Sequence, residues 1–141
     1  MLIQSTEKNE KIVLGLLSYT YTDENPTIED LKKVLGQYRE DPDTILYLYK
    51  DADTENYVGI VVVEIVASDD SDDHEQTPTP ISDKTVNILR LAVMPSFRNE
   101  GIGYKMYRDL KRLYSDATII GTMNTVDVIT EWSRKYNLEN Q

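Results

Sequence analysis

Cysteine is absent from the 141-residue sequence, and histidine, tryptophan and phenylalanine each occur only once. Without cysteine the chain has no disulfide bond, no thiolate nucleophile and no zinc site of the cysteine type. No run of apolar residues approaches the roughly 20 that a membrane-spanning helix needs, and the opening MLIQSTEKNEK is too polar for a signal peptide. These absences favour a cytoplasmic protein, and the length favours a single domain.

Positive charge is also scarce, because 25 acidic residues outnumber 15 basic ones and give a formal net charge of −10. This balance argues against nucleic acid or an anionic membrane as a partner. Residues 98–114 are the exception, with five basic residues against two acidic ones. On charge alone, this segment reads as a solvated helix face.

Hydrophobic periodicity predicts both helices and strands. Apolar residues at three- and four-residue spacing predict helices over residues 8–18, 27–38, 101–114 and 126–136. β-Branched, aromatic or continuous apolar runs predict strands over 44–49, 57–66, 86–94 and 117–120, the first two joined as an antiparallel hairpin. Thr27 is expected to cap the second helix, and Ile12 and Leu113 are expected on apolar helix faces. With a short initial strand, the order β-α-α-β-β-β-α-β-α predicts an α/β domain with a mixed sheet.

Residues 67–85 (ASDDSDDHEQTPTPISDKT) break this periodicity. Five acidic residues fall within positions 69–75 and two prolines follow, so we predict a flexible acidic loop inserted in the single domain. The only histidine, His74, lies within it. A metal or base role for His74 would need further ligands of fixed geometry, so a solvated histidine is the simpler interpretation and no metal site is expected.

Two glycines, Gly101 and Gly103, lie where the third long helix should begin. A strand, a glycine-containing loop and a helix with basic residues form a device for holding phosphate, because the first N–H groups of a helix have no partners within it. A Walker loop is excluded, since Tyr104 follows the second glycine where lysine is required. A dinucleotide fingerprint fits poorly, since Met106 stands at the place of the third glycine.

The hexapeptide from Arg98 to Gly103 (RNEGIG) resembles the signature Arg/Gln-x-x-Gly-x-Gly/Ala of the GNAT acetyltransferases. The longer string ILRLAVMPSFRNEGIGYKMYRDL is similar to the signature segment of that family over its whole length. The element order on either side also resembles this family. The resemblance implies a GNAT acyl-CoA N-acyltransferase fold, with a mixed central sheet flanked by helices. A narrower resemblance is to the RibT group of this family, which is encoded with riboflavin biosynthesis genes.

By this resemblance, the chain is expected to bind acetyl-CoA or CoA and to transfer acetyl groups to a small-molecule or protein amine. The backbone beside the pantetheine arm is implied to be that of Leu91, Ala92 and Val93, with Val93 facing the thioester carbonyl. The expected pyrophosphate-binding residues are Arg98, Asn99, Glu100, Gly101, Ile102, Gly103 and Tyr104. Asn124 matches an asparagine that often meets the pantetheine, although it could instead cap the last helix.

The catalytic residues are where the sequence departs from the family pattern. Members typically place a tyrosine seven residues after the asparagine, but Glu131 stands there and Trp132 is beside it. Tyr136 is the candidate proton donor, or else a core or surface tyrosine. Glu64 is a candidate base with a raised pKa, or else an outward-facing glutamate at a sheet edge. Arg90 is expected to contact an anionic acceptor or phosphate, or to pair with an acid such as Glu64.

Only five residues follow Tyr136, whereas the family usually adds two strands that wall the acceptor site. The resemblance therefore implies a C-terminally shortened fold. Its acceptor cleft is open, or is completed by the 67–85 loop or by another subunit, as in a homodimer. Two rival hypotheses stay open. One is a catalytically degenerate GNAT domain that binds CoA thioesters as a sensor or assembly partner, and the other is an acidic interaction protein that works through residues 69–75.

Overall fold

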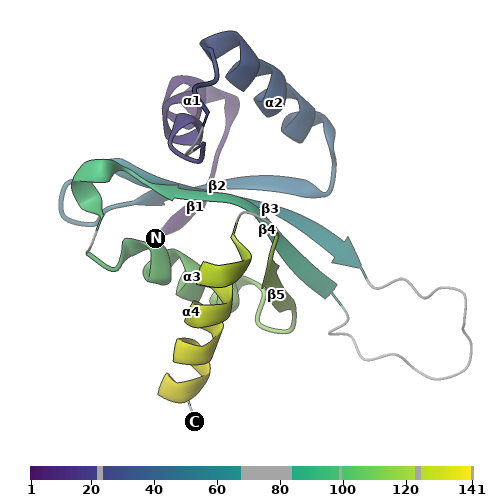
Figure 1. Cartoon of the computed structure of the whole chain (residues 1–141), viewed down its shortest axis with the longest axis vertical. Coiled ribbons are helices and arrows are strands. Elements are labelled where there is room, and N and C mark those ends of the chain that lie inside the picture. Colours follow the sequence, from purple (N-terminus) through teal and green to yellow (C-terminus); the bar gives the residue numbers. More distant parts are fainter. Residues whose placement is uncertain (22–23, 68–83, 99, 123–124, 141) are drawn as a thin grey trace, which may run out of the picture.

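A five-stranded sheet forms the centre of the molecule (Figure 1). The computed structural model describes residues 1–21, 24–67, 84–98, 100–122 and 125–140. The strands lie in chain order, with antiparallel pairs except for the last, which is parallel. They are β1 (Leu2–Gln4), β2 (Thr44–Lys50), β3 (Tyr57–Ala67), β4 (Lys84–Val93) and β5 (Thr118–Gly121). The α/β fold with a mixed sheet, predicted from the sequence, is confirmed.

Helices cover both faces of this sheet. One face carries the first two helices and the other carries the last two (Figure 1). Short 3-10 turns at Glu7–Asn9 and Pro95–Phe97 precede the first and third helices. The helices are α1 (Glu10–Ser18), α2 (Ile28–Glu40), α3 (Ile102–Leu113) and α4 (Val126–Glu139).

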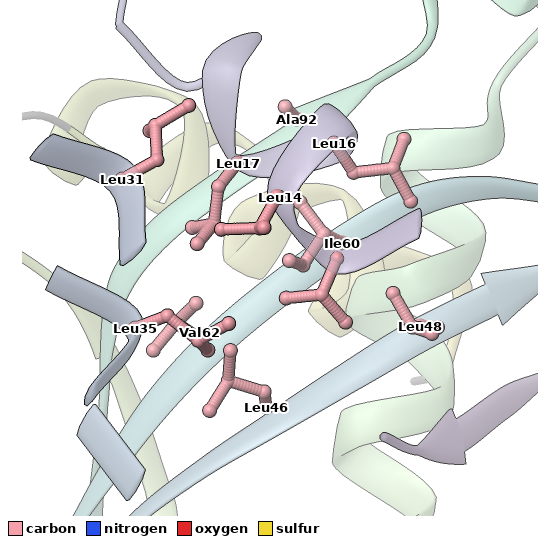
Figure 2. Packing of buried hydrophobic residues seen from close by; sticks show 11 residues of the cluster. Leu14, Leu16, Leu17, Leu31, Leu35, Leu46, Leu48, Ile60, Val62 and Ala92 are labelled. Carbon is pink, nitrogen blue, oxygen red and sulfur yellow. The ribbon is translucent and has the colours of Figure 1, made fainter. Parts of the chain in front are cut away.

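The expected hairpin of β2 and β3 is confirmed and supplies much of the core. Successive residues of a strand point to opposite faces of the sheet, so Ile60 and Val62 pack toward α1 and α2 while Val61 and Val63 pack toward α3 and α4. All four side chains are fully buried. Figure 2 shows the first of these two layers, in which leucines of α1 and α2 meet the sheet.

The cap predicted for α2 is confirmed. Thr27 Oγ1 accepts a hydrogen bond from the Asp30 N–H at 3.1 Å, and the Asp30 carboxylate accepts one from the Thr27 N–H at 3.0 Å. This reciprocal pair satisfies two N–H groups that the helix itself leaves without partners. Because these bonds favour the charged form, they lower the pKa of Asp30.

Three expectations about local structure are wrong. Ala67 pairs with Lys84, and Val66 pairs with Thr85, so both ends of the predicted 67–85 loop belong to strands. Backbone hydrogen bonds extend a ladder whatever the polarity of its side chains. Residues 68–83, with His74 among them, lie outside the described residues. Ile12 and Leu113 are 41% and 55% exposed, because Leu14 of α1 and the tyrosines of α3 fill the core instead.

Candidate functional site

The parallel pairing of β4 and β5 ends at Ile88 and Gly121, but β4 continues to Val93. Two hydroxyls mark this point, because Thr122 Oγ1 and Thr125 Oγ1 each donate to the Ile88 carbonyl at 3.0 Å. They fix the turn that leads from β5 into α4. Beyond Ile88, within the described part of the chain, β4 is paired only with β3. The other edge of β4 therefore faces an open space.

Backbone groups of the last β4 residues point into this space. The Met94 N–H donates to the Val58 carbonyl at 2.8 Å, so Met94 faces β3. Because neighbouring residues of a strand alternate in direction, the N–H and carbonyl of Val93 face away from β3, as do those of Leu91. In agreement, the Val93 carbonyl accepts a hydrogen bond at 3.0 Å from Arg98 Nε, which is not part of the sheet.

A cleft of about 580 Å³ occupies the space beside β4. It collects residues from the end of α1, the end of β4, the loop after it, the start of α3 and one side of α4. The lining consists of Tyr19, Leu91, Ala92, Val93, Phe97, Arg98, Gly101, Ile102, Gly103, Tyr104, Val128, Trp132 and Lys135.

Most of the residues predicted to bind the cofactor meet in this cleft. Glu100 is exposed and is not part of the lining. Asn99 and Asn124 lie outside the described residues, so their expected roles stay predictions. The sequence did not single out Tyr19, Phe97, Val128 or Lys135, because no local pattern shows which parts of other helices reach a loop.

The first residues of α3 line the cleft, at the end of the helix where N–H groups have no partner within it. Gly101 has φ of 78°, a left-handed conformation that favours glycine. The first helical hydrogen bond runs from the Lys105 N–H to the Gly101 carbonyl at 3.1 Å. The N–H groups of Ile102, Gly103 and Tyr104 therefore have no acceptor within the helix, and the helix dipole makes this end partly positive.

The second glycine has a different structural reason. A Cβ atom added to Gly103 would lie 2.7 Å from Cη2 and 2.8 Å from Cζ2 of Trp132. The indole thus fills the place of a side chain, and it also leans on the ring of Tyr107 with centroids 6.2 Å apart. Trp132 therefore packs α4 against the first turn of α3 while forming part of the cleft wall.

Two cations and a neutral tyrosine complete the mouth of the cleft. Arg98 and Lys135 are exposed, and Lys135 Nζ lies 4.3 Å from the centroid of the Tyr104 ring. The Tyr104 hydroxyl donates to Glu139 Oε1 at 2.5 Å. Burial, followed by this bond to a carboxylate, raises the pKa of Tyr104 to about 12. Tyr104 is thus uncharged near neutral pH, and the cleft mouth keeps its two positive side chains.

A model of the Acetyltransferase (GNAT) family matches residues 10–133. The chain belongs to this family. It is 32% identical over 132 residues to a Bacillus methanolicus protein named an uncharacterized N-acetyltransferase in the lysA 3′ region, with 92% of each chain covered. The family and this relative support an N-acetyltransferase.

Solved GNAT structures show the same fold. A GNAT family acetyltransferase from Staphylococcus aureus subsp. aureus USA300_TCH1516 matches with a TM-score of 0.63 at 17% identity, covering 89% of this chain and 87% of that one. The aminoglycoside acetyltransferase AAC(6′)-Iy matches with a TM-score of 0.62 at 11% identity, covering 96% and 87%. That structure is a complex with the bisubstrate analogue CoA-S-monomethyl-acetylneamine.

The two candidate catalytic residues lie away from the GNAT cleft. Tyr136 packs edge-on against Tyr107, with ring centroids 6.1 Å apart, and is not part of the lining. Glu64 accepts a hydrogen bond from Asn87 Nδ2 at 3.5 Å, and β3 lies inside the sheet, so the expectation of an edge position is wrong. Glu64 is five positions from Gly59, the partner of Val93, which is about 17 Å along the strand. Their catalytic roles stay predictions.

Neither a metal cluster nor a membrane helix is found in the ranges that the structure describes. No three His, Asp or Glu side chains there are grouped as metal ligands are. Among the described helices, none is long and apolar enough to span a bilayer.

Proposed function

We propose that this GNAT protein is an acetyl-CoA-dependent N-acetyltransferase, acting on the amine of a small molecule or a protein. The observation that carries the proposal is the cleft between the free edge of β4 and the start of α3. It combines outward-facing strand backbone at Val93 with an exposed helix N-terminus at Gly101. The relative AAC(6′)-Iy, of the same fold, is solved with a CoA-based analogue.

The residues of the cleft fit coenzyme A as a ligand. The N–H groups of the first α3 turn, with Arg98 and Lys135, suit a diphosphate. The backbone of Leu91 and Val93 suits the amide groups of a pantetheine arm, as one strand suits another. When bound, acetyl-CoA supplies a thioester whose acyl C–S bond is replaced by the C–N bond of the product amide.

The protein must then deal with the proton of the attacking amine. A lysine-type amine has a pKa of about 10.4 and attacks only when neutral. The described lining holds neither a carboxylate nor a histidine, and its side-chain hydroxyls are those of Tyr19 and Tyr104. Because the Tyr104 hydroxyl already donates its proton to a hydrogen bond with Glu139, Tyr19 is the better placed of the two to pass a proton between the cleft and solvent. Tyr136 and Glu64 remain proposals from the family resemblance, and would act only through intervening groups.

Location, partners and pathway are parts of the same proposal. The absence of cysteine supports a cytoplasmic enzyme. The net charge of −10 argues against nucleic acid or an anionic membrane as a partner. We also propose a homodimer in which the second subunit completes the acceptor site. Light scattering should then give twice the mass of one chain. Because of the RibT resemblance, diamines of the flavin pathway should be included among the acceptors tested. If the enzyme does not acetylate them, the proposed link to riboflavin biosynthesis is refuted.

The competing function is a degenerate domain that binds CoA thioesters without transferring the acetyl group. Trp132 at the cleft, beside the place where the family pattern expects tyrosine, favours this alternative. Release of CoA thiol from acetyl-CoA in the presence of an amine panel separates the two functions. Amine-dependent thiol release, with the acetylated amine identified by mass spectrometry, rules out the degenerate domain.

Ligand binding tests the cofactor independently of turnover. A ligand that binds only the folded state at 100 times its Kd stabilises it by about 2.7 kcal/mol, so saturating acetyl-CoA is expected to raise the melting temperature by several degrees. NAD and ATP at the same concentration are expected to leave it nearly unchanged. No shift with millimolar acetyl-CoA overturns the proposal.

A further inference from the structure

Arg90 lies on β4 just before the residues that line the cleft and is not itself part of the lining. It is on the face of the sheet that α1 and α2 cover. It is opposite Val62 of β3, and Ala92, two residues further along the same face, lines the cleft. Tyr19 lines the cleft as well, and the chain runs directly from it into Thr20 and Tyr21, which contact Arg90. Arg90 is therefore next to the side of the cleft that faces α1.

Three groups from other elements hold the guanidinium in place. Arg90 Nε donates to the Tyr38 hydroxyl at 2.9 Å, and Nη1 donates to Thr20 Oγ1 at 3.3 Å. The guanidinium carbon lies 4.0 Å above the centroid of the Tyr21 ring. These contacts come from the segment after α1 and from α2, so they fix a long, part-buried side chain in one orientation.

None of these partners carries a negative charge. Burial raises the pKa of Tyr21, although Arg90 beside it acts in the opposite direction, so the phenol is neutral at physiological pH. Among the acids that the structure describes, Glu24 and Asp30 affect the pKa of Tyr21, and both are exposed. Among the described residues no carboxylate forms an ion pair with Arg90.

The hydrogen-bonding capacity of Arg90 is also incompletely used. A guanidinium has five N–H donors in a planar fork, and the described contacts occupy those of Nε and one of Nη1. A part-buried cation is held at a cost in free energy unless a negative group pairs with it, and the described residues supply none for Arg90. Such an arrangement is suited to an anion that arrives with a ligand, because the fork is already oriented for two parallel hydrogen bonds.

We propose that Arg90 binds the carboxylate of the acceptor, so that the substrate is an amine that also carries a carboxylate. This inference rests on the proposed acetyltransferase function. Three residues separate Arg90 from Val93, where the acetyl group is expected, and a strand rises about 3.3 Å per residue. Arg90 and Val93 are therefore on the order of 10 Å apart along the strand. Because the Arg90 side chain reaches part of this way, the distance between the amine and the carboxylate of the acceptor must be somewhat shorter. This spacing selects a side-chain amine of a diamino acid over an α-amine.

A single guanidinium among neutral hydroxyls matches a single negative charge. A phosphate monoester carries nearly two charges near neutral pH, and no second cation joins Arg90 in the described contacts. A carboxylate is therefore the anion that the charge of this site fits best.

Matched acceptor pairs test the inference directly. Lysine and cadaverine differ only by the carboxylate, as do ornithine and putrescine. The wild-type enzyme is expected to show a kcat/KM for lysine or ornithine at least about tenfold above that for the corresponding diamine, as a charged hydrogen-bonded pair provides. The difference should lie mainly in KM.

Variants at Arg90 separate binding from a structural role. Arg90→Met is expected to abolish the preference while turnover of cadaverine and binding of acetyl-CoA persist, and Arg90→Lys should retain part of it. Tyr38→Phe, which keeps the ring and removes one support of the guanidinium, should weaken the preference without unfolding. Lys32→Ala removes an exposed cation of α2 and serves as the matched control, with the preference unchanged.

Each other outcome contradicts the inference in a recognisable way. Equal use of both members of each pair, or Arg90 variants that slow both equally, shows that Arg90 has only a structural role. Preference for O-phosphoethanolamine over every carboxylated amine assigns the site to phosphate. Turnover of plain amines with no turnover of carboxylated ones refutes the substrate class but leaves the acetyltransferase. Absence of turnover with all amines, together with no acetyl-CoA shift, refutes the proposed function itself.

Discussion

The indole of Trp132 stands where a side chain of Gly103 would stand, 2.7 Å from the position of its Cβ. Two residues 29 positions apart in sequence therefore determine together how α4 packs on the first turn of α3. Gly103 permits this contact, whereas Gly101 permits the left-handed backbone that begins the helix. Both glycines also line the cleft.

Alanine substitutions at three glycines should have three different effects. Gly103→Ala meets the Trp132 ring, and overpacking of this kind costs about 1–3 kcal/mol of unfolding free energy. Gly101→Ala meets no neighbouring atom, but it places a side chain at φ of 78°, which costs about 1–2 kcal/mol. Urea denaturation measures both changes.

Gly36 of α2 provides the matched control, since a Cβ there also meets nothing within 4 Å and its φ is not positive. Gly36→Ala should stabilise the protein by about 0.5–1 kcal/mol. Gly103→Ala should cost less stability in a Trp132→Leu background than in wild type, because the ring atoms that the added methyl group would meet are gone. If Gly103→Ala costs as much in that background as in wild type, the Trp132 contact is not the reason for glycine at this position.

Acetyl-CoA binding should depend on Lys135 but not on its neighbour in the sequence. Lys135 lines the cleft mouth, whereas Arg134 is exposed on α4 outside the lining. Lys135→Ala should weaken acetyl-CoA binding by about three- to tenfold at low salt, with the effect reduced at 0.5 M salt because exposed charges are screened. Isothermal titration calorimetry gives both affinities. Equal weakening by Arg134→Ala would indicate a general charge effect rather than a contact.

The sequence predicted the frame of the molecule and missed several contacts that complete the site. Element order, the β2–β3 hairpin and the Thr27 cap depend on local patterns, and these are confirmed. The roles of Tyr19 and Trp132 at the cleft depend on how α1 and α4 pack against β4 and α3. Such packing between distant segments has no local signature, so the sequence alone does not place Trp132 at the cleft.

Stability should fall in alkali partly because of Tyr104. Its pKa is raised to about 12 in the folded protein, whereas an unfolded tyrosine titrates near about 10. Above pH 10 the unfolded chain loses this proton first, so stability decreases as pH rises from 10 to 12 and is fully present below pH 10. Burial and a hydrogen bond with Tyr47 raise the pKa of Tyr114 as well, which adds to the loss.

Tyr104→Phe should therefore flatten part of this decline. Urea midpoints measured from pH 8 to 11.5 for wild type and variant give the difference. A variant whose midpoint falls as steeply as that of wild type would show that Tyr104 does not titrate with a raised pKa.

Replacing Tyr19 and replacing Tyr136 should have different effects on turnover. Tyr19 lines the cleft beside Ala92, while the Tyr136 ring packs on Tyr107 outside it. A side chain that transfers a proton in the reaction typically contributes about 10²- to 10⁴-fold to the rate. Tyr19→Phe is thus expected to lower kcat by at least about tenfold with the acetyl-CoA KM unchanged, and Tyr136→Phe should leave kcat within about twofold. The reverse pattern, with turnover abolished in Tyr136→Phe alone, would assign proton transfer to the tyrosine that the family resemblance first suggested, and it would require α4 to move when the substrates bind.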